Sequence, residues 1–304
     1  MAFSNFIKID VADGNASSDT VRTYGHQMRQ YLLWCQQFEI NPAIATSKQI
    51  KQYRHWMVEE RNYKPATIAL KLTAVRRFYD AAREHGLLTI NPAIGIKPPR
   101  DKKDKGEKIT FLEADEARKL LDGIPDDLSL KSRRDLAMVY MMTLEGTRTV
   151  EMHRANIADV VQQGNNVGVR VEGKSNIRIV PLTPEIAGYL LNYLQHRQRV
   201  EGNLSPEKPL FVSLSNHNRY GRLSRKCIRD VVNKYLIQED LKHKPGRTLS
   251  AHSLRHTAGT LALRAGADLR QVQDLLGHAD PRMTAIYAHI GDRWKTNPAL
   301  KLDL

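Results

Sequence analysis

A stretch rich in proline and charge, residues 96–108, divides the sequence into two parts with different hydrophobic patterns. It reads IKPPRDKKDKGEK and has no apolar periodicity, so no packed helix or strand is expected there. Before it, apolar residues recur at helical spacing, whereas after it helical and alternating patterns both occur. The sequence therefore predicts two domains, residues 1–95 and 109–304, joined by a basic linker at 96–108.

The first part contains three predicted helices. In the first, at 18–38, apolar residues three and four positions apart form one face. The second is predicted at 47–61. The third begins near Pro65, because proline is favoured in the first helical turn, and it ends near Gly86. This pattern is typical of a small helical bundle.

The second part combines helices with one β-hairpin. Residues 166–182, NVGVRVEGKSNIRIVPL, alternate apolar and polar side chains around a Gly-Lys-Ser-Asn turn. Helical patterns occupy 111–124, 133–146, 184–199, 224–240, 250–265, 268–276 and 281–289. The predicted fold class is therefore mainly α, with an N-terminal helical bundle followed by an α-rich domain that holds a small antiparallel β-sheet.

Positive side chains greatly outnumber negative ones. Lys and Arg total 47 and Asp and Glu 33, which gives a formal net charge of +14 at pH 7. This excess favours a polyanionic partner, with nucleic acid ahead of an anionic membrane, although an ordinary basic protein stays an alternative. The longest apolar run, 136–142, is too short to cross a bilayer, and Cys35 and Cys227 give no disulfide framework. We expect no membrane partner and a cytoplasmic location.

Four side chains near the C-terminus are candidates for a common site. His252 and Arg255 are three residues apart, so a helix places them on neighbouring positions of one face. His278 follows Gly277, a residue that often ends helices. Tyr287 lies in the next predicted helix. Each alone has an ordinary explanation, such as a capping histidine, a surface arginine or a core tyrosine, and only their spacing is informative.

The run HSLRHT…LGHADPRMTAIYAH resembles the C-terminal signature of the tyrosine recombinase (phage integrase) family. Two upstream segments extend the resemblance. LEGTRTVEM at 144–152 resembles the family's G-x-R-x-x-E segment, and VEGKSNIRIVPL at 171–182 resembles its β-hairpin lysine segment, with a shorter turn. The match covers 108–290, and the N-terminal bundle resembles the family's core-binding domain. Xer-like and transposon-associated recombinases are the most similar subgroups.

The resemblance implies a site-specific enzyme that cleaves and rejoins DNA through a 3′-phosphotyrosyl intermediate, with no metal ion or cofactor. Its six implied catalytic residues are Arg148, Lys174, His252, Arg255, His278 and Tyr287. Tyr287 would attack the phosphodiester, and the guanidinium forks of Arg148 and Arg255 would offset the negative charge of the transition state. A covalent intermediate conserves the energy of the broken bond, so strands can be rejoined without ATP.

The other implied residues manage protons and orientation. His252 would accept the proton of the tyrosine, and Lys174 would protonate the 5′-oxygen that leaves. His278 would bind the scissile phosphate and position the tyrosine. Glu151, one helical turn after the first arginine, is expected to orient that arginine or His252.

The remaining histidines are expected to be structural. His252 and His256 are four residues apart, but HSLRH lacks the glutamate of HExxH and no cysteine cluster lies nearby. We therefore expect no metal site, core roles for His256 and His289, and a surface position for Arg264.

Basic residues outside these motifs are expected to contact double-stranded DNA, with an ordinary solvated face as the alternative for each. They are Lys71, Arg76 and Arg77 in the third helix, and Arg222, Arg225 and Lys226 near the start of the helix at 224–240. Some of these could also reach the major groove.

The resemblance further implies a homotetramer on paired DNA sites, or a heterotetramer with a related recombinase, in the nucleoid of the cytoplasm. Leu300 and Leu302 in the C-terminal tail would anchor it on a neighbouring protomer. Two other functions stay open: a type IB topoisomerase-like enzyme that relaxes DNA, and a DNA-binding protein without catalysis.

Overall fold

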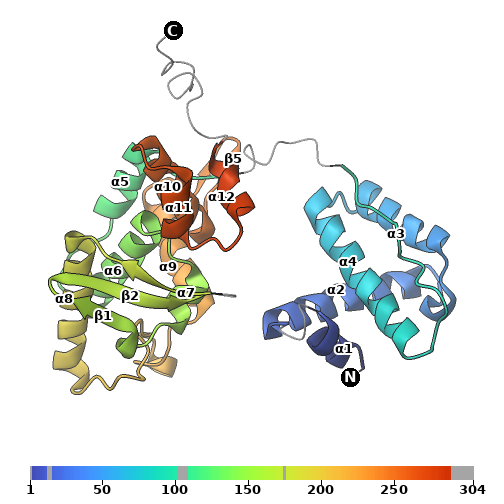
Figure 1. Ribbon diagram of the computed structural model, residues 1–304, viewed down its shortest axis with the longest axis horizontal. Coiled ribbons are helices and arrows are strands. Elements are labelled where there is room, and N and C mark those ends of the chain that lie inside the picture. Colours follow the sequence, from blue (N-terminus) through green and yellow to red (C-terminus); the bar gives the residue numbers. More distant parts are fainter. Residues whose placement is uncertain (1, 12–15, 101–108, 174–175, 289–304) are drawn as a thin grey trace, which may run out of the picture. The chain divides into compact units, whose positions relative to one another are not determined.

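The computed structural model describes residues 2–11, 16–100, 109–173 and 176–288 (Figure 1). Two compact units are distinguished, residues 1–104 and residues 105–304. Both are mainly helical, and the strands form small antiparallel sheets in the second unit, which confirms the predicted fold class. Within the described ranges, no helix has the length and apolar character needed to cross a membrane.

The described residues of the first unit form four α-helices around an aromatic core. They are α1 (Ala2–Asp10), α2 (Ser18–Gln37), α3 (Ser47–Glu59) and α4 (Pro65–Glu84), with a short 3₁₀ helix at Pro42–Ile44. Tyr31 and Tyr79 share a buried hydrogen bond of 2.7 Å between their hydroxyl groups, and Tyr53 packs edge-on against Tyr31. The three predicted helices are confirmed. The first helix, α1, was not predicted, and it packs through Phe6 and Ile7.

The second unit is organised around α6, which is buried on nearly all sides. Its helices are α5 (Ala114–Asp122), α6 (Leu130–Leu144), α7 (Thr149–Arg154), α8 (Pro184–Glu201), α9 (Arg225–Gln238), α10 (Ala251–Arg264), α11 (Leu269–Leu276) and α12 (Pro281–Ala288). The helices α8 and α10 pack against α6, and Figure 1 shows α10, α11 and α12 gathered together. Helix α6 therefore supports the C-terminal helices that carry the candidate catalytic residues.

A three-stranded antiparallel sheet lies beside these helices. Its strands β1 (Val160–Gln163), β2 (Asn166–Glu172) and β3 (Ile177–Pro181) follow one another in sequence order across the sheet. The buried Val169 pairs with Val160 on one side and Val180 on the other. Strands β2 and β3 confirm the predicted hairpin, and β1 is an additional strand. A second sheet contains only β4 (His243–Lys244) and β5 (Arg247–Thr248).

The segment before α5 is attached directly to α10. The Leu112 N–H donates to Thr257 Oγ1 at 2.9 Å, and Thr110 Oγ1 and Ser253 Oγ lie 3.0 Å apart. Both α10 residues are buried and lie within two positions of Arg255. The start of the second unit therefore helps to hold the helix that carries His252 and Arg255.

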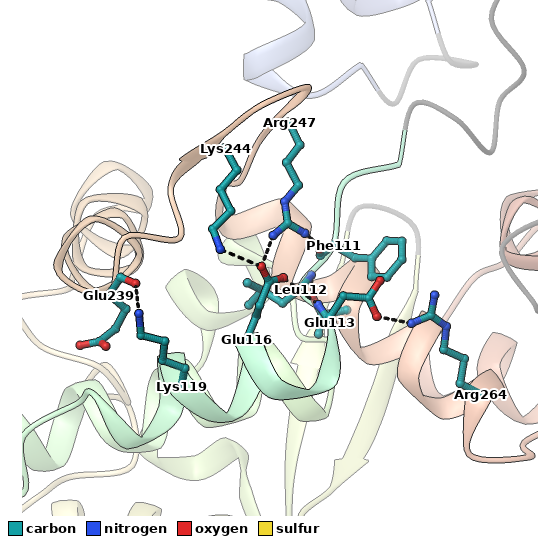
Figure 2. Close-up of polar contacts among 10 residues, drawn as sticks. Phe111, Leu112, Glu113, Glu116, Lys119, Glu239, Lys244, Arg247 and Arg264 are labelled. Carbon is teal, nitrogen blue, oxygen red and sulfur yellow. Dashed lines mark hydrogen bonds and ion pairs between the residues drawn. The ribbon is translucent and has the colours of Figure 1, made fainter.

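Charged side chains reinforce the same attachment (Figure 2). Arg264 forms an ion pair with Glu113, and its guanidinium carbon lies 5.1 Å from the ring centroid of Phe111. Glu116 forms ion pairs with Lys244, at 3.2 Å, and with Arg247 of the β4–β5 hairpin. Arg264 is partly exposed, as expected of a surface residue, but it also joins α10 to the segment before α5.

Candidate active site

A cavity of about 420 Å³ in the second unit brings together residues from several separate segments. Its walls are formed by Arg148, His252, Arg255, His256, His278, Arg282, Met283, Ile286 and Tyr287. Five of the six expected catalytic residues are in this set. Lys174, the sixth, lies outside the described residues, as do His289, Leu300 and Leu302.

Arg148 is fixed by the buried carboxylate of Glu151. It precedes α7, and its backbone N–H donates to Glu151 Oε2 at 2.8 Å while its Nη1 donates to Oε1 at 2.7 Å. The three-residue spacing makes this possible, because the first turn of a helix brings these positions together. Glu151 thus contacts Arg148, one of the two residues that it was expected to orient.

Arg255 is almost completely buried, with 2% of its surface exposed, and it binds two chain segments. Its Nη1 donates to the Gly146 carbonyl oxygen at 2.6 Å, and its Nη2 donates to the Leu276 carbonyl oxygen. Burial and then the like charge of Arg148 lower the pKa of Arg255 to about 9. The group still carries its charge at neutral pH, so it supplies a fixed cation to the cavity.

Arg178 on β3 is a third cation beside this site, and the sequence analysis did not identify it. Its Nη1 lies 3.4 Å from Glu151 Oε1, and its Nη2 donates to the Leu275 carbonyl oxygen at 3.4 Å. Burial lowers the pKa of Arg178, with Glu151 acting against that change. The alternation of the strand is the signal that could have identified it. Arg178 lies two residues from Val180, so a buried Val180 places Arg178 on the same inward face.

Gly277 lets the end of α11 lie close to Arg178. Its φ of +60° is in the left-handed region, and a Cβ there would be 2.4 Å from Arg178 Cδ. His278 follows, and its Nδ1 is hydrogen-bonded to Thr284 Oγ1 at 2.9 Å. Burial, and then Arg255, lower the pKa of His278 to about 3, so the ring is neutral at pH 7. The Nε2 atom is the ring nitrogen left for a ligand.

Tyr287 lies on the floor of the cavity with only 1% of its surface exposed. Its ring is stacked near that of His278, with centroids 6.4 Å apart, and it passes so close to Gly259 that a Cβ there would be 3.2 Å from ring atoms. Burial raises the pKa of Tyr287 to about 12, although Arg255 and Arg148 act against it. The hydroxyl is therefore protonated at neutral pH and needs an acceptor before it can attack.

His256 differs from the expectation of a purely structural core residue. It lines the cavity, and its Nδ1 lies 2.7 Å from the Tyr287 hydroxyl oxygen. His252 also lines the cavity, but its ring lies edge-on against His256, with centroids 4.5 Å apart. Burial and the charges of Arg255 and Arg148 lower the pKa of His252. His252, the expected base, therefore contacts His256, and His256 contacts Tyr287.

Two of the residues expected to contact DNA form hydrogen bonds within the protein. Lys71 is 5% exposed, and its ammonium donates to Gln27 Oε1 at 2.9 Å and also to Gln30. Arg222 donates from Nη1 to the backbone oxygens of His153 and Arg154, at 2.7 Å and 2.9 Å. Lys71 does not lie on a free surface, so the structure does not support a role for it in binding DNA. Arg222 is half-buried, and its expected role in DNA binding stays a prediction.

The other four basic residues are at least partly accessible. Arg76 donates to the Ile96 carbonyl oxygen at 3.3 Å, and Arg77 lies 3.6 Å from Asp80. Arg225 is the first residue of α9, and the exposed Lys226 forms an ion pair with Asp230 at 2.7 Å. Their expected role in DNA binding stays a prediction.

The described part of the chain contains no cluster of three or more His, Cys, Asp or Glu residues arranged to hold a metal ion. The charged groups in and beside the cavity are mainly cationic. Arg148, Arg255 and Arg282 line it, and Arg178 lies beside it with Glu151 as the close carboxylate. Such a set of guanidinium groups is suited to binding an anion such as phosphate.

Known proteins resemble this chain over most of its length. Residues 110–293 match the model described as the phage integrase family, and residues 11–85 match the phage integrase N-terminal SAM-like domain. Tyrosine recombinase XerC of Thermodesulfovibrio yellowstonii is 31% identical over 291 residues, which cover 95% of this chain and 90% of that protein. Tyrosine recombinase XerD of Staphylococcus epidermidis is 28% identical over 290 residues, which cover 95% of this chain and 92% of that protein.

Solved structures share the fold at lower identity. The XerH site-specific recombinase bound to palindromic difH substrate, in its post-cleavage complex, gives a TM-score of 0.75 at 18% identity, covering 98% of this chain and 84% of that one. A lambda integrase (75–356) dimer bound to a COC′ core site gives 0.70 at 17% identity, covering 96% and 95%. The two-domain helical architecture described above is thus shared with recombinase structures.

Proposed function

Because this chain belongs to the phage integrase family and is a site-specific tyrosine recombinase, an enzyme that breaks and rejoins DNA, we propose that the cavity around Tyr287 is its active site. The observation that carries the proposal is the convergence of two anchored arginines and a buried tyrosine on one cavity. Fixed cations there would stabilise the charge that builds up on a phosphodiester under attack.

The proposed reaction begins with the scissile phosphate between Arg148 and Arg255. The Tyr287 oxygen gives up its proton to a base in the cavity and attacks phosphorus, a 3′-phosphotyrosyl bond forms, and the bond to the 5′-oxygen breaks. Lys174 would give that oxygen the proton it needs to leave as a hydroxyl group. Attack by the free 5′-hydroxyl of another strand then reverses these steps and releases the tyrosine, which is why no ATP is required.

The remaining groups would bind and orient. His278 Nε2 would donate a hydrogen bond to a non-bridging phosphate oxygen, and Glu151 would hold Arg148 in place. His252, whose ring lies edge-on against His256, would also bind the phosphate. We expect cleavage without a divalent metal ion, since guanidinium groups take the place of a metal charge.

The proposed substrate is double-stranded DNA, which fits a formal net charge of +14. The solved relatives include a lambda integrase tetramer bound to a Holliday junction. By analogy we propose a homotetramer on paired sites, or a heterotetramer with a related recombinase, acting on DNA of the nucleoid in the cytoplasm. We also propose that the first domain ends at residue 95 and that residues 96–108 form a linker. Leu300 and Leu302 would dock on a neighbouring protomer.

The test is covalent capture on DNA that the wild-type protein retains from a randomised pool. A nicked duplex of that sequence should give a protein–DNA adduct that resists denaturation. Tyr287→Phe should give none, because it lacks the nucleophilic oxygen, whereas Tyr189→Phe on α8, outside the cavity, should behave as wild type. An adduct with Tyr287→Phe would refute the assignment of the nucleophile.

The same material separates the alternative functions. Strand exchange between two copies of the retained site, unaffected by a chelator, is expected of a recombinase. Relaxation of supercoiled DNA without exchange would favour the topoisomerase-like alternative, and binding without any adduct would favour the DNA-binding protein without catalysis.

A further inference from the structure

The Tyr287 hydroxyl has one close side-chain neighbour that the proposed mechanism leaves unused. His256 Nδ1 lies 2.7 Å from it, which is within the range required of a general base and the atom it deprotonates. His252, the residue first expected in that role, contacts His256 edge-on. The side chain of Tyr287 is therefore paired with His256, and the ring of His252 is paired with His256.

We propose that His256 is the catalytic base that receives the phenolic proton of Tyr287, while His252 binds the phosphate and orients the His256 ring. This rests on the proposed function, because it needs Tyr287 to be the nucleophile. The transfer of the tyrosine proton and the exchange of bonds at phosphorus balance in one step. The tyrosine oxygen bonds to phosphorus, its proton passes to His256 Nδ1, and the leaving 5′-oxygen takes its proton from the separate general acid.

Helix α10 places this base in fixed relation to the phosphate. His256 directly follows Arg255, whose guanidinium is anchored by the carbonyl oxygens of Gly146 and Leu276. The same helix presents Gly259, where a Cβ would lie only 3.2 Å from the ring of Tyr287. One rigid element thus holds the cation, the base and the surface against which the nucleophile packs, which is how an enzyme keeps reacting groups aligned.

The surroundings keep His256 able to accept a proton. The titratable and charged groups around it are His252 and Arg255 on its own helix, Tyr287 and Arg282 on α12, His278 before α12, and Arg148 before α7. Burial, and then His252 and Arg255, lower the pKa of His256 to about 4, so its ring is neutral at pH 7. A bound phosphate would offset the arginine charges, and that change favours the protonated histidine as the reaction proceeds.

Two substitutions separate proton transfer from simple positioning. His256→Asn places an amide oxygen near the position of Nδ1, so it can accept the hydrogen bond but cannot take the proton. His256→Phe keeps a ring of similar size and removes both nitrogens. His196→Asn on α8, outside the cavity, is the matched control, and thermal unfolding of each variant shows whether it folds.

The measurement is the single-turnover rate of adduct formation on the retained nicked duplex, with either oxygen or sulfur at the bridging 5′ position. A sulfur leaving group needs no general acid, so this substrate reports on activation of the nucleophile alone. We expect both His256 variants to be slower by about 100-fold or more on both substrates. We expect their DNA affinity and the rate of His196→Asn to equal those of wild type.

Three results would overturn the proposal. A wild-type rate for His256→Asn would limit His256 to positioning, wild-type rates for both variants would exclude it from the reaction, and a defect cured by the sulfur substrate would assign it to the leaving group. A wild-type protein that forms no adduct at Tyr287 would instead refute the proposed function itself. As a further check, the wild-type rate should fall as the pH is lowered through the pKa of His256, because the protonated ring cannot accept.

Discussion

The carboxylate of Glu151 balances the positive charge beside the cavity. Its oxygens contact the backbone and guanidinium of Arg148, at 2.8 Å and 2.7 Å, and Arg178 Nη1 at 3.4 Å. The group is buried, so water does little to screen these interactions. Removing its charge would leave arginines close together without their nearest counter-ion.

We predict that Glu151→Gln lowers the rate of adduct formation by about 10- to 100-fold, the usual effect of losing a residue that orients a catalytic group. It should also lower the free energy of unfolding by about 3 kcal/mol, because buried cations lose their partner. Glu172→Gln is the control, since Glu172 forms a comparable but exposed ion pair with Arg154 at 2.8 Å. Equal rates for the two variants would show that Arg148 needs no orienting carboxylate.

Five of the nine residues that line the cavity were expected to share a site, because short motifs keep their spacing. The cavity contains Arg148 and Tyr287, which lie 139 positions apart in the numbering, and only the resemblance joined them. Arg178 was missed because Ile177 and Ile179, on either side of it, suggest that the apolar face of the strand is the buried one. In the structure these two isoleucines are 67% and 55% exposed, and the arginine faces inward.

The contact between His256 and Tyr287 was not predicted, for a different reason. The sequence shows a histidine one residue after Arg255, but it does not show on which side of α10 the tyrosine lies. That depends on how α12 folds back onto α10, which is a long-range contact. Helical spacing alone therefore could not distinguish a core histidine from a partner of Tyr287.

At the scale of elements, the caps and the hairpin were the predictable features. Pro65 is the first residue of α4, and Gly277 ends α11, as expected from the sequence. The elements that were not predicted, such as α1, β1 and the β4–β5 hairpin, are short. Their stability comes from packing and ion pairs with distant segments, which local sequence does not report.

Two threonines on α10 test how strongly the segment before α5 supports this helix. Thr257 Oγ1 accepts from the Leu112 N–H at 2.9 Å and donates to the Ser253 carbonyl oxygen at 3.0 Å. Thr260, one turn further, is also buried, but its Oγ1 has no hydrogen-bond partner among the described residues. The two residues have the same size and burial and differ in what their hydroxyl groups contact.

We predict opposite outcomes for replacing each threonine with valine, which has the same shape. Thr257→Val should lower the free energy of unfolding by about 1–3 kcal/mol, because the buried Leu112 N–H loses its acceptor. Thr260→Val should leave stability unchanged or raise it, because it removes an unsatisfied buried hydroxyl. Chemical denaturation of both variants measures this directly. If both lose stability equally, the attachment through Leu112 contributes nothing specific.

At the scale of the whole molecule, the net charge overstates how many basic groups are available to DNA. Arg134 and Arg197 form buried ion pairs with Asp135 and Glu201, at 2.6 Å in each case. Arg222 and Lys71 are likewise engaged inside their units. These groups cannot be recognised from the sequence alone, because an arginine that binds a carbonyl oxygen has the same sequence signature as one that binds phosphate. We therefore expect the accessible basic residues to set the affinity for DNA.

This distinction can be measured through the salt dependence of DNA binding, using the Tyr287→Phe background so that no covalent adduct forms. Each cation bound to phosphate releases counter-ions, so the affinity should fall steeply as salt rises, by about 1000-fold between 50 and 200 mM if six phosphates are contacted. Lys226→Gln removes a cation whose side chain is 77% exposed, and it should reduce the slope of log affinity against log salt by about 1. Lys71→Gln removes a buried cation and should leave the slope unchanged. A slope that is flat, or that responds equally to both substitutions, would contradict the assignment of accessible lysines to phosphate.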